Sequence, residues 1–121
     1  MLRQILRSKI QNATVTEACL EYEGSITLDP LVIEAAGLLP GELVLVVNLN
    51  NGERLETYVI AGAPGSGVVC LNGPAARRGV IGDRLHILAF GLVDEIEAKS
   101  VVPYFVALGA KNEIVEQRPW G

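Results

Sequence analysis

The chain has 121 residues, half of them hydrophobic, which is enough for one compact domain with a single core and leaves no room for a second domain. Fourteen acidic and ten basic residues give a net charge of −4, which would repel a phosphate backbone and argues against nucleic acid as a partner. No apolar run approaches the roughly 20 residues of a membrane-spanning helix, and the basic opening segment lacks a signal peptide's apolar stretch and cleavage site, so we expect a soluble, cytoplasmic protein.

The first clear local signal is a short helix in LDPLVIEAAG (28–37). Asp29 can cap this helix, and Pro30 suits its first turn. Gly37 can adopt the left-handed conformation that ends a helix.

A β-hairpin is predicted after this helix. The segment LVLVVNL (43–49) is an aliphatic run of strand length, and the Asn-Gly pair behind it favours a tight turn. In the return strand, ERLETYVIA (53–61), side chains alternate between two faces. Arg54 and Tyr58 therefore point the same way, and Thr57 points the opposite way.

The rest of the chain predicts more strands joined by turns. In order, we expect a loop at 61–67, a buried strand at 68–72, a turn or helical turn at 73–79, a strand at 84–90, a small acidic helix near 94–98, a strand at 102–108 and a turn before 113–116. Strands dominate, so the fold is expected to be mainly β.

Two segments about a third of the chain apart resemble each other. Both AAGLLPGELVLVV (35–47) and AARRGVIGDRLHILA (75–89) place two alanines before glycine, two apolar residues, a glycine-acid pair and a strand. Two such units could interlock about a pseudo-twofold axis and close into a small barrel without exposed sheet edges.

Conventional catalytic or metal-binding sets are scarce in this sequence. The one histidine, His86, lies inside a predicted strand and is expected to be structural, since a lone histidine builds no metal site. Cys19 and Cys70 form neither a disulfide framework nor a zinc motif, so reduced thiols and no metal are expected. A Ser-His-Asp set and a phosphate-binding Gly-Lys-Ser/Thr loop are also missing.

Three strings carry a resemblance to a known family: YEGSITLD (22–29), NNGERLETYVI (50–60) and GSGVVCLNG (65–73). Together with a short N-terminal strand that carries Lys9, they closely resemble the aspartate 1-decarboxylase family over nearly the full length. The resemblance implies a small six-stranded double-psi β-barrel with short helices, spanning 1–121 as a single domain. It also implies a cytoplasmic homotetramer, with active sites near subunit interfaces, that makes β-alanine for pantothenate and coenzyme A.

The Gly24-Ser25 pair can be understood chemically. Attack of Ser25 Oγ on the Gly24 carbonyl carbon would turn the amide into an ester, and glycine permits the strained backbone that this requires. Elimination, hydration and loss of ammonia would then leave a pyruvoyl group at position 25. The resemblance thus implies self-cleavage of a zymogen into residues 1–24 (the beta chain) and 25–121 (the alpha chain); a Gly-Ser pair alone is usually a plain turn.

The pyruvoyl group derived from Ser25 is the cofactor that the resemblance implies. Its ketone would form an imine (Schiff base) with the amine of L-aspartate, and the adjacent amide carbonyl would accept the electrons released with carbon dioxide, as pyridoxal phosphate does in other enzymes. Tyr58 would be the proton donor to the resulting carbanion.

The same resemblance assigns substrate-binding residues. Arg54, a planar bidentate donor, would anchor the carboxylate that is kept, and Lys9 would add positive charge. Thr57 matches a threonine used in substrate contact and processing. Because it lies on the strand face opposite Tyr58, we expect one of the two to face a subunit interface or the strand to be irregular.

A last substrate-binding stretch is Asn72 with Gly73, Pro74 and Ala75, which aligns with the family's Asn-Gly-Ala-Ala. Pro74 has no N–H, so a backbone donor at that position is missing, and Gly73 or Ala75 would donate instead. The family's frequent histidine two places after the lysine is replaced by Gln11.

Two other functions remain open from the sequence. One is a non-catalytic double-psi barrel that binds a partner and keeps the Gly24-Ser25 bond intact. The other is a pyruvoyl decarboxylase for another small amino acid, since one arginine and one lysine do not measure substrate length. The sequence also leaves open whether maturation needs a helper protein.

Overall fold

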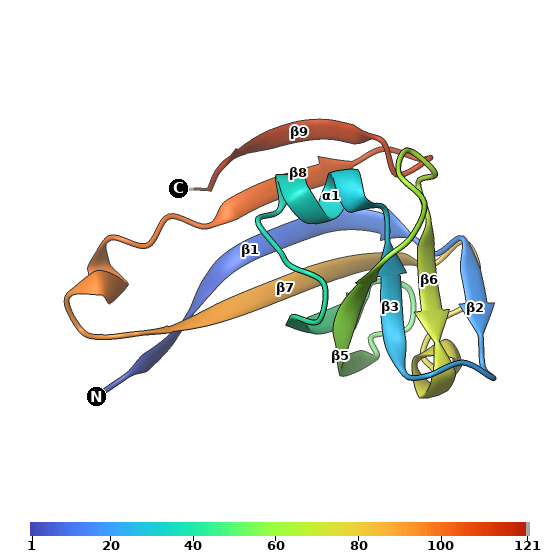
Figure 1. Ribbon diagram of the computed structural model, residues 1–121, viewed down its shortest axis with the longest axis horizontal. Helices are drawn as coiled ribbons and strands as arrows, with labels where there is room; N and C mark the ends of the chain where they lie inside the picture. Colours follow the sequence, from blue (N-terminus) through green and yellow to red (C-terminus); the bar gives the residue numbers. More distant parts are fainter. Residues whose placement is uncertain (121) are drawn as a thin grey trace.

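The computed structural model describes residues 1–120, in which nine strands form one continuous curved sheet with three short helical elements (Figure 1). The strands are β1 (Arg3–Thr14), β2 (Glu17–Cys19), β3 (Ser25–Leu28), β4 (Leu43–Asn48), β5 (Arg54–Ala61), β6 (Val69–Asn72), β7 (Arg84–Val93), β8 (Tyr104–Leu108) and β9 (Ile114–Pro119). The helix α1 (Pro30–Ala35) and the 3-10 helices η1 (Gly73–Arg77) and η2 (Glu97–Lys99) complete the chain.

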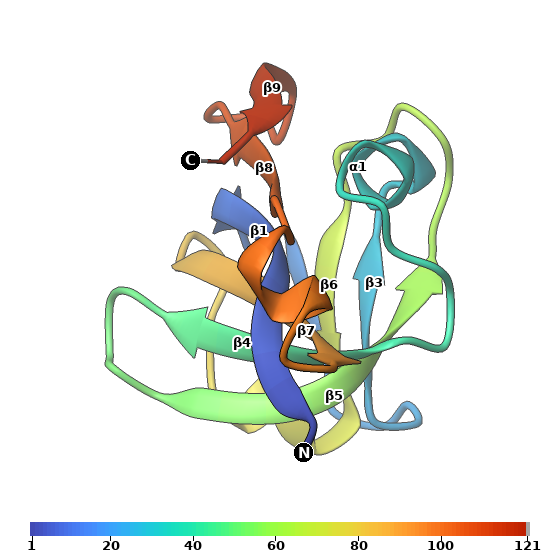
Figure 2. The same ribbon diagram turned by 90° about the vertical axis from the view of Figure 1, so that its left-hand side faces the viewer.

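The strand order in the sheet is β2-β6-β3-β5-β4-β7-β1-β8-β9. Neighbouring strands are antiparallel except in the pairs β2–β6, β3–β5 and β1–β8, which are parallel. Figures 1 and 2 show the sheet curving round so that β3 and β6 run steeply across the direction of β1 and β7. The mainly β fold with short helices is confirmed; residues 1–120 hold nine strands where six were expected, and the double-psi arrangement stays a prediction.

The core lies inside this curved sheet and is almost entirely aliphatic. Its fully buried side chains include Ile10, Ile26, Leu28, Val44, Val46, Val59, Leu71, Leu85, Ile87 and Val106. In β4 and β7 the buried positions alternate with exposed or half-buried ones, as expected for strands with one face on the core. The opposite, outer face of these strands is therefore free for other contacts.

The short helix is confirmed. The Asp29 carboxylate accepts a hydrogen bond from the Leu31 backbone N–H at 2.9 Å, Pro30 lies in the first turn, and Gly37 has a φ of +67°. The same carboxylate accepts from the N–H groups of Gly65 at 3.1 Å and Gly67 at 3.0 Å. Burial alone would raise the pKa of Asp29, but these three donors lower it overall and fasten the loop before β6 to the helix.

The two segments with similar sequences adopt the same local structure. Gly41 and Gly82 take φ values of +90° and +95°, and each lies in the turn that leads into a strand, β4 or β7. These two strands pair antiparallel, with Val46 opposite its sequence equivalent Ile87. The internal similarity therefore corresponds to a local twofold relation at the centre of the sheet.

The N- and C-terminal strands differ from expectation. The N-terminal strand, expected to be short, extends over 12 residues because β1 pairs with β7 along one edge and with β8 along the other. The segment after the last turn forms β9, whose residues are all exposed. Its sequence lacks a buried alternation, and its strand geometry comes from pairing with β8. Within residues 1–120, no helix has the length and apolar character needed to cross a membrane.

Candidate functional site

The Gly24-Ser25 bond lies where the chain enters β3, next to a hollow of about 340 Å³. The hollow is lined by Gly24, Leu55, Glu56, Thr57, Tyr58, Pro74, Ala75 and Arg78. Ser25 itself has no exposed surface and lies directly behind Gly24. Five of the residues singled out from the sequence therefore line one cavity, although they come from three separate segments.

The hollow lies beside a stretch of β5 that is hydrogen-bonded to a neighbouring strand along only one of its two edges. One edge pairs with β4 along Arg54–Tyr58, whereas the other pairs with β3 only from Val59 onward. The second edge of 55–58 is therefore free and borders the hollow. This explains how Thr57 and Tyr58, on opposite faces of a regular strand, both line it. The local irregularity that we considered is not present.

Ser25 is held in a buried polar network. Its Oγ donates to the Glu23 carbonyl oxygen at 3.2 Å and accepts from Asn72 Nδ2 at 2.9 Å. Asn72 Nδ2 also donates to Thr27 Oγ1 at 2.8 Å. Because both amide hydrogens are used, the Asn72 side chain is fixed with its donors toward Ser25.

Cys70 fixes the other end of this amide. Its thiol donates to Asn72 Oδ1 at 3.1 Å. Burial, followed by the nearby charge of Glu17, raises the pKa of Cys70, so the thiol keeps the proton that it donates. Cys70 is buried and Cys19 is exposed, and both are free thiols.

Gly73 allows the loop that begins η1 to pack closely against the backbone of Gly24. It has a φ of +64°, and a Cβ at this position would come within 2.6 Å of the Tyr22 carbonyl oxygen and 2.9 Å of Gly24 N and Cα. Only glycine allows this approach. Pro74, which follows it, lies 3.5 Å from where a Cβ on Gly24 would be. The backbone around Gly24 is therefore enclosed on this side.

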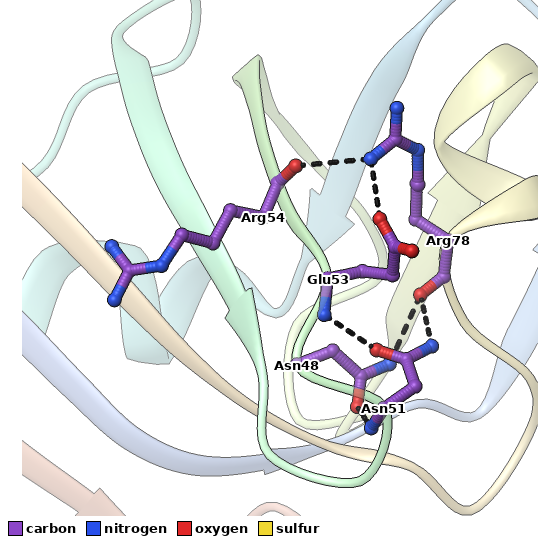
Figure 3. Close-up of polar contacts among 5 residues, drawn as sticks. All are labelled: Asn48, Asn51, Glu53, Arg54 and Arg78. Atoms are coloured by element: carbon purple, nitrogen blue, oxygen red, sulfur yellow. Dashed lines mark hydrogen bonds and ion pairs between the residues drawn. The ribbon is translucent and has the colours of Figure 1, made fainter.

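The far end of this loop is tied to the β4–β5 hairpin, as Figure 3 shows. Arg78 Nη1 donates to Glu53 Oε2 at 2.5 Å and to the Arg54 carbonyl oxygen at 3.3 Å. The Arg78 carbonyl oxygen accepts from the side-chain amides of Asn48 at 3.1 Å and Asn51 at 2.9 Å. The segment that contains η1 therefore contacts Gly24 at one end and is hydrogen-bonded to the β4–β5 hairpin at the other.

Arg54 and Lys9 do not line the hollow. In Figure 3 the Arg54 side chain extends away from the Arg78 guanidinium. Arg54 pairs with Val47, and Val47 pairs with His86, so these three residues lie in one row across β5, β4 and β7. Leu88, two residues after His86 on β7, pairs with Lys9 on β1. Because residues two apart on a strand share a face, Arg54 and Lys9 both belong to the outer face of the sheet, with His86 between their strands.

His86 is half-buried on this face. Burial first, and then the positive charges of Lys9 and Arg84, lower the pKa of His86 below its ordinary value of 6.5. At neutral pH the imidazole is uncharged, so His86 adds no positive charge to this face. Within residues 1–120 no group of three or more His, Cys, Asp or Glu side chains is arranged to hold a metal ion.

Several contributors to these regions were missed by sequence reasoning. Thr27 could have been found, because it lies two residues after Ser25 and so shares its strand face. Glu56, Arg78 and the Cys70 thiol gave no signal, since only the folded chain brings them to the hollow or to Asn72.

Known proteins resemble this chain along most of its length. The family model described as aspartate decarboxylase matches residues 1–115. The chain belongs to this family. An aspartate 1-decarboxylase of Listeria monocytogenes is 52% identical over 94% of this chain and 90% of the relative, and one of Dehalococcoides mccartyi is 53% identical over 93% and 90%. One of Caldicellulosiruptor saccharolyticus is 53% identical over 96% of this chain and 91% of the relative. The resemblance found in the sequence is confirmed, and the protein is an enzyme of the aspartate decarboxylase family.

Proposed function

We propose that this chain is the zymogen of a pyruvoyl-dependent lyase that converts L-aspartate to β-alanine and carbon dioxide. Relatives named aspartate 1-decarboxylase, more than half identical along most of the chain, support the reaction. The observation that carries the proposal is the buried Ser25, whose Oγ accepts a hydrogen bond from Asn72. Gly73 packs closely against Gly24, and Tyr58 lines the hollow beside it.

Self-cleavage begins at Ser25. Its Oγ bonds to the Gly24 carbonyl carbon, the Gly24–Ser25 C–N bond breaks, and the Oγ proton passes to the released nitrogen. The Asn72 amide, 2.9 Å from Oγ, stabilises negative charge that develops there. Loss of the residue 25 α-proton expels the Gly24 carboxylate, and water then replaces the nitrogen as ammonia. The products are residues 1–24 and a chain 25–121 that begins with the pyruvoyl group.

Tyr58 is well placed for the proton transfer that follows decarboxylation. The pyruvoyl group would supply a ketone that condenses with the substrate amine and an adjacent amide carbonyl that takes up the electron pair left when carbon dioxide departs. Parallel pairing begins at Ile26–Val59, so Tyr58 precedes this pair on β5 as Ser25 does on β3. The Tyr58 hydroxyl donates the proton that replaces the lost carboxylate. Thr57, Asn72, Gly73, Pro74 and Ala75 form the rest of the substrate's surroundings.

Arg54 and Lys9 bind the substrate from a second subunit. In one chain they lie on the outer sheet face and do not line the hollow at Gly24. That face also exposes large apolar side chains, with Leu43 61% and Phe90 40% exposed, which is typical of a surface that another protein covers. A homotetramer with active sites near its subunit interfaces would bring the two regions together, with Arg54 binding the retained carboxylate as a bidentate donor.

The biological setting follows the family. The product β-alanine would feed pantothenate and coenzyme A synthesis in the cytoplasm. Whether a helper protein assists maturation is tested by incubating the purified chain alone and following the cleavage.

Mass spectrometry of the purified protein tests the proposal. We expect fragments of 24 and 97 residues, the lengths of 1–24 and 25–121, with a pyruvoyl group blocking the larger. Ser25→Ala should stay intact and release no carbon dioxide, whereas Tyr58→Phe should be cleaved but turn over slowly. Fully active protein with an intact 24–25 amide would refute the mechanism, and an intact, inactive chain would favour the binding module.

A further inference from the structure

The C-terminal segment beyond the family match returns to the sheet near Lys9. The match ends at residue 115, within β9, and the chain then runs to Trp120. The Trp120 backbone N–H donates to the Pro103 carbonyl oxygen at 2.8 Å, which holds the backbone of Trp120 beside the start of β8. Trp120 is the protein's single tryptophan.

Cations and aromatic rings alternate at this place on the outer face. Lys9 Nζ lies 5.4 Å from the centroid of the Trp120 ring, within the range of a cation–π interaction. The rings of Trp120 and Phe105 are 6.4 Å apart, and the Arg118 guanidinium carbon lies 4.5 Å over Phe105. Register supports the grouping, because Phe105 pairs with both Lys9 and Arg118.

Lys9 has few other means of being held. In the part of the chain that the structure describes, the four ion pairs are made by arginines, and none includes Lys9. A lysine side chain is a flexible four-carbon stem with a point charge at its end, so an unpaired ammonium would move among many rotamers. An aromatic face attracts the ammonium without neutralising its charge.

We propose that Trp120 is a positioning residue that holds the Lys9 ammonium ready for the substrate's carboxylate. The inference rests on the proposed function, in which Lys9 contributes to substrate binding. The ring keeps the charge on the outer face, near the row that contains Arg54. The chain end outside the family match thus takes part in substrate recognition.

Fluorescence tests the contact without any activity. With excitation at a wavelength that the three tyrosines do not absorb, emission reports Trp120 alone, so Lys9→Met should change its intensity or wavelength and increase quenching by acrylamide. The matched control is Lys99→Met, which removes the same charge from the exposed η2 and should leave emission unchanged. L-aspartate should alter the emission of the wild-type protein and have little effect on Lys9→Met.

Kinetics test the role. Trp120→Leu keeps apolar bulk and removes the π system; it should cleave normally and raise KM for aspartate about 2- to 5-fold, the size of an exposed cation–π contact, with kcat little changed. Trp120→Phe should recover much of this loss. In the Lys9→Met background, Trp120→Leu should have no further effect on KM, because the two side chains act as a unit.

The outcomes separate this inference from the proposed function. If Lys9→Met leaves the emission unchanged, or Trp120→Leu leaves KM unchanged, the role proposed for Trp120 is wrong even if the enzyme decarboxylates aspartate. An uncleaved, inactive wild-type protein whose emission still responds to Lys9→Met refutes the proposed function and leaves the Lys9–Trp120 contact standing.

Discussion

The region around Gly24 and the outer face around Lys9 and Arg54 are built in opposite ways. At Gly24 the groups are buried and within hydrogen-bond distance of one another, as with Ser25 and Asn72. On the outer face, Arg54 is exposed and Lys9 only partly buried, among apolar side chains. A reaction within one backbone needs atoms held tightly by that same chain, whereas a small substrate with two carboxylates can be bound where two chains meet.

This difference predicts separate functions for the two regions. Substitutions of the buried groups that hold the Gly24–Ser25 bond, such as Asn72 and Gly73, should affect cleavage, and through it activity. Substitutions on the outer face should leave cleavage intact and affect only the handling of aspartate. The following experiments test that division.

The largest effect is expected from Arg54→Ala. Cleavage should proceed normally, while kcat/KM for aspartate falls about 100-fold, as expected when a charge-assisted bidentate contact is lost. Mass spectrometry and carbon dioxide release measure the two properties separately. Arg54→Lys keeps the positive charge but lacks the planar guanidinium that donates two parallel hydrogen bonds, and should recover only part of the activity.

Mixed oligomers make this test sharper. Ser25→Ala chains co-expressed with Arg54→Ala chains should regain activity at about a quarter of the sites, because random pairing in a symmetric oligomer joins an intact position 25 with an intact Arg54 from the neighbour. No activity in the mixture would mean that both residues act within one chain, and the two regions would then form a single site.

A glycine substitution tests the tight region. Gly73→Ala should slow or prevent cleavage, because its Cβ would overlap Gly24 and the Tyr22 carbonyl oxygen. Gly52→Ala is the control: its φ of +76° is similar, but nothing lies within 4 Å of the added Cβ. The control should lose only about 1–2 kcal/mol of unfolding free energy, the cost of the left-handed conformation, and should cleave normally. Equal cleavage in both variants would contradict the role given to Gly73.

The smallest effect concerns His86 on the outer face. Its pKa is lowered in the folded protein, so below about pH 6.5 the unfolded chain binds the proton more readily and stability falls until the folded pKa is passed. His86→Gln should remove this part of the pH dependence of urea unfolding. NMR of the single histidine measures its pKa directly, and Lys9→Met should move it back toward 6.5. A pKa at or above 6.5 in the wild-type protein would contradict the burial and charges described.

Much of the local structure could be predicted because its causes are local. The Asp29-Pro30 start and Gly37 end of α1 are short-range steric and hydrogen-bond signals, and the Asn-Gly turn that joins β4 to β5 is of the same kind. The same-face placement of Arg54 and Tyr58 follows from strand alternation alone. By contrast, β9 has no buried position to mark it as a strand in the sequence, and its strand geometry comes from pairing with β8.

The sequence by itself determined the family, the mainly β class and the residue types of the candidate site, because spaced motifs and alternation are written along the chain. Tertiary structure alone decided which of those residues meet. The free edge of β5 brings Thr57 and Tyr58 to Gly24, whereas Lys9 and Arg54 lie outside this hollow, with Trp120 against Lys9. Such proximity depends on strand pairing between distant segments, which no short stretch of sequence encodes.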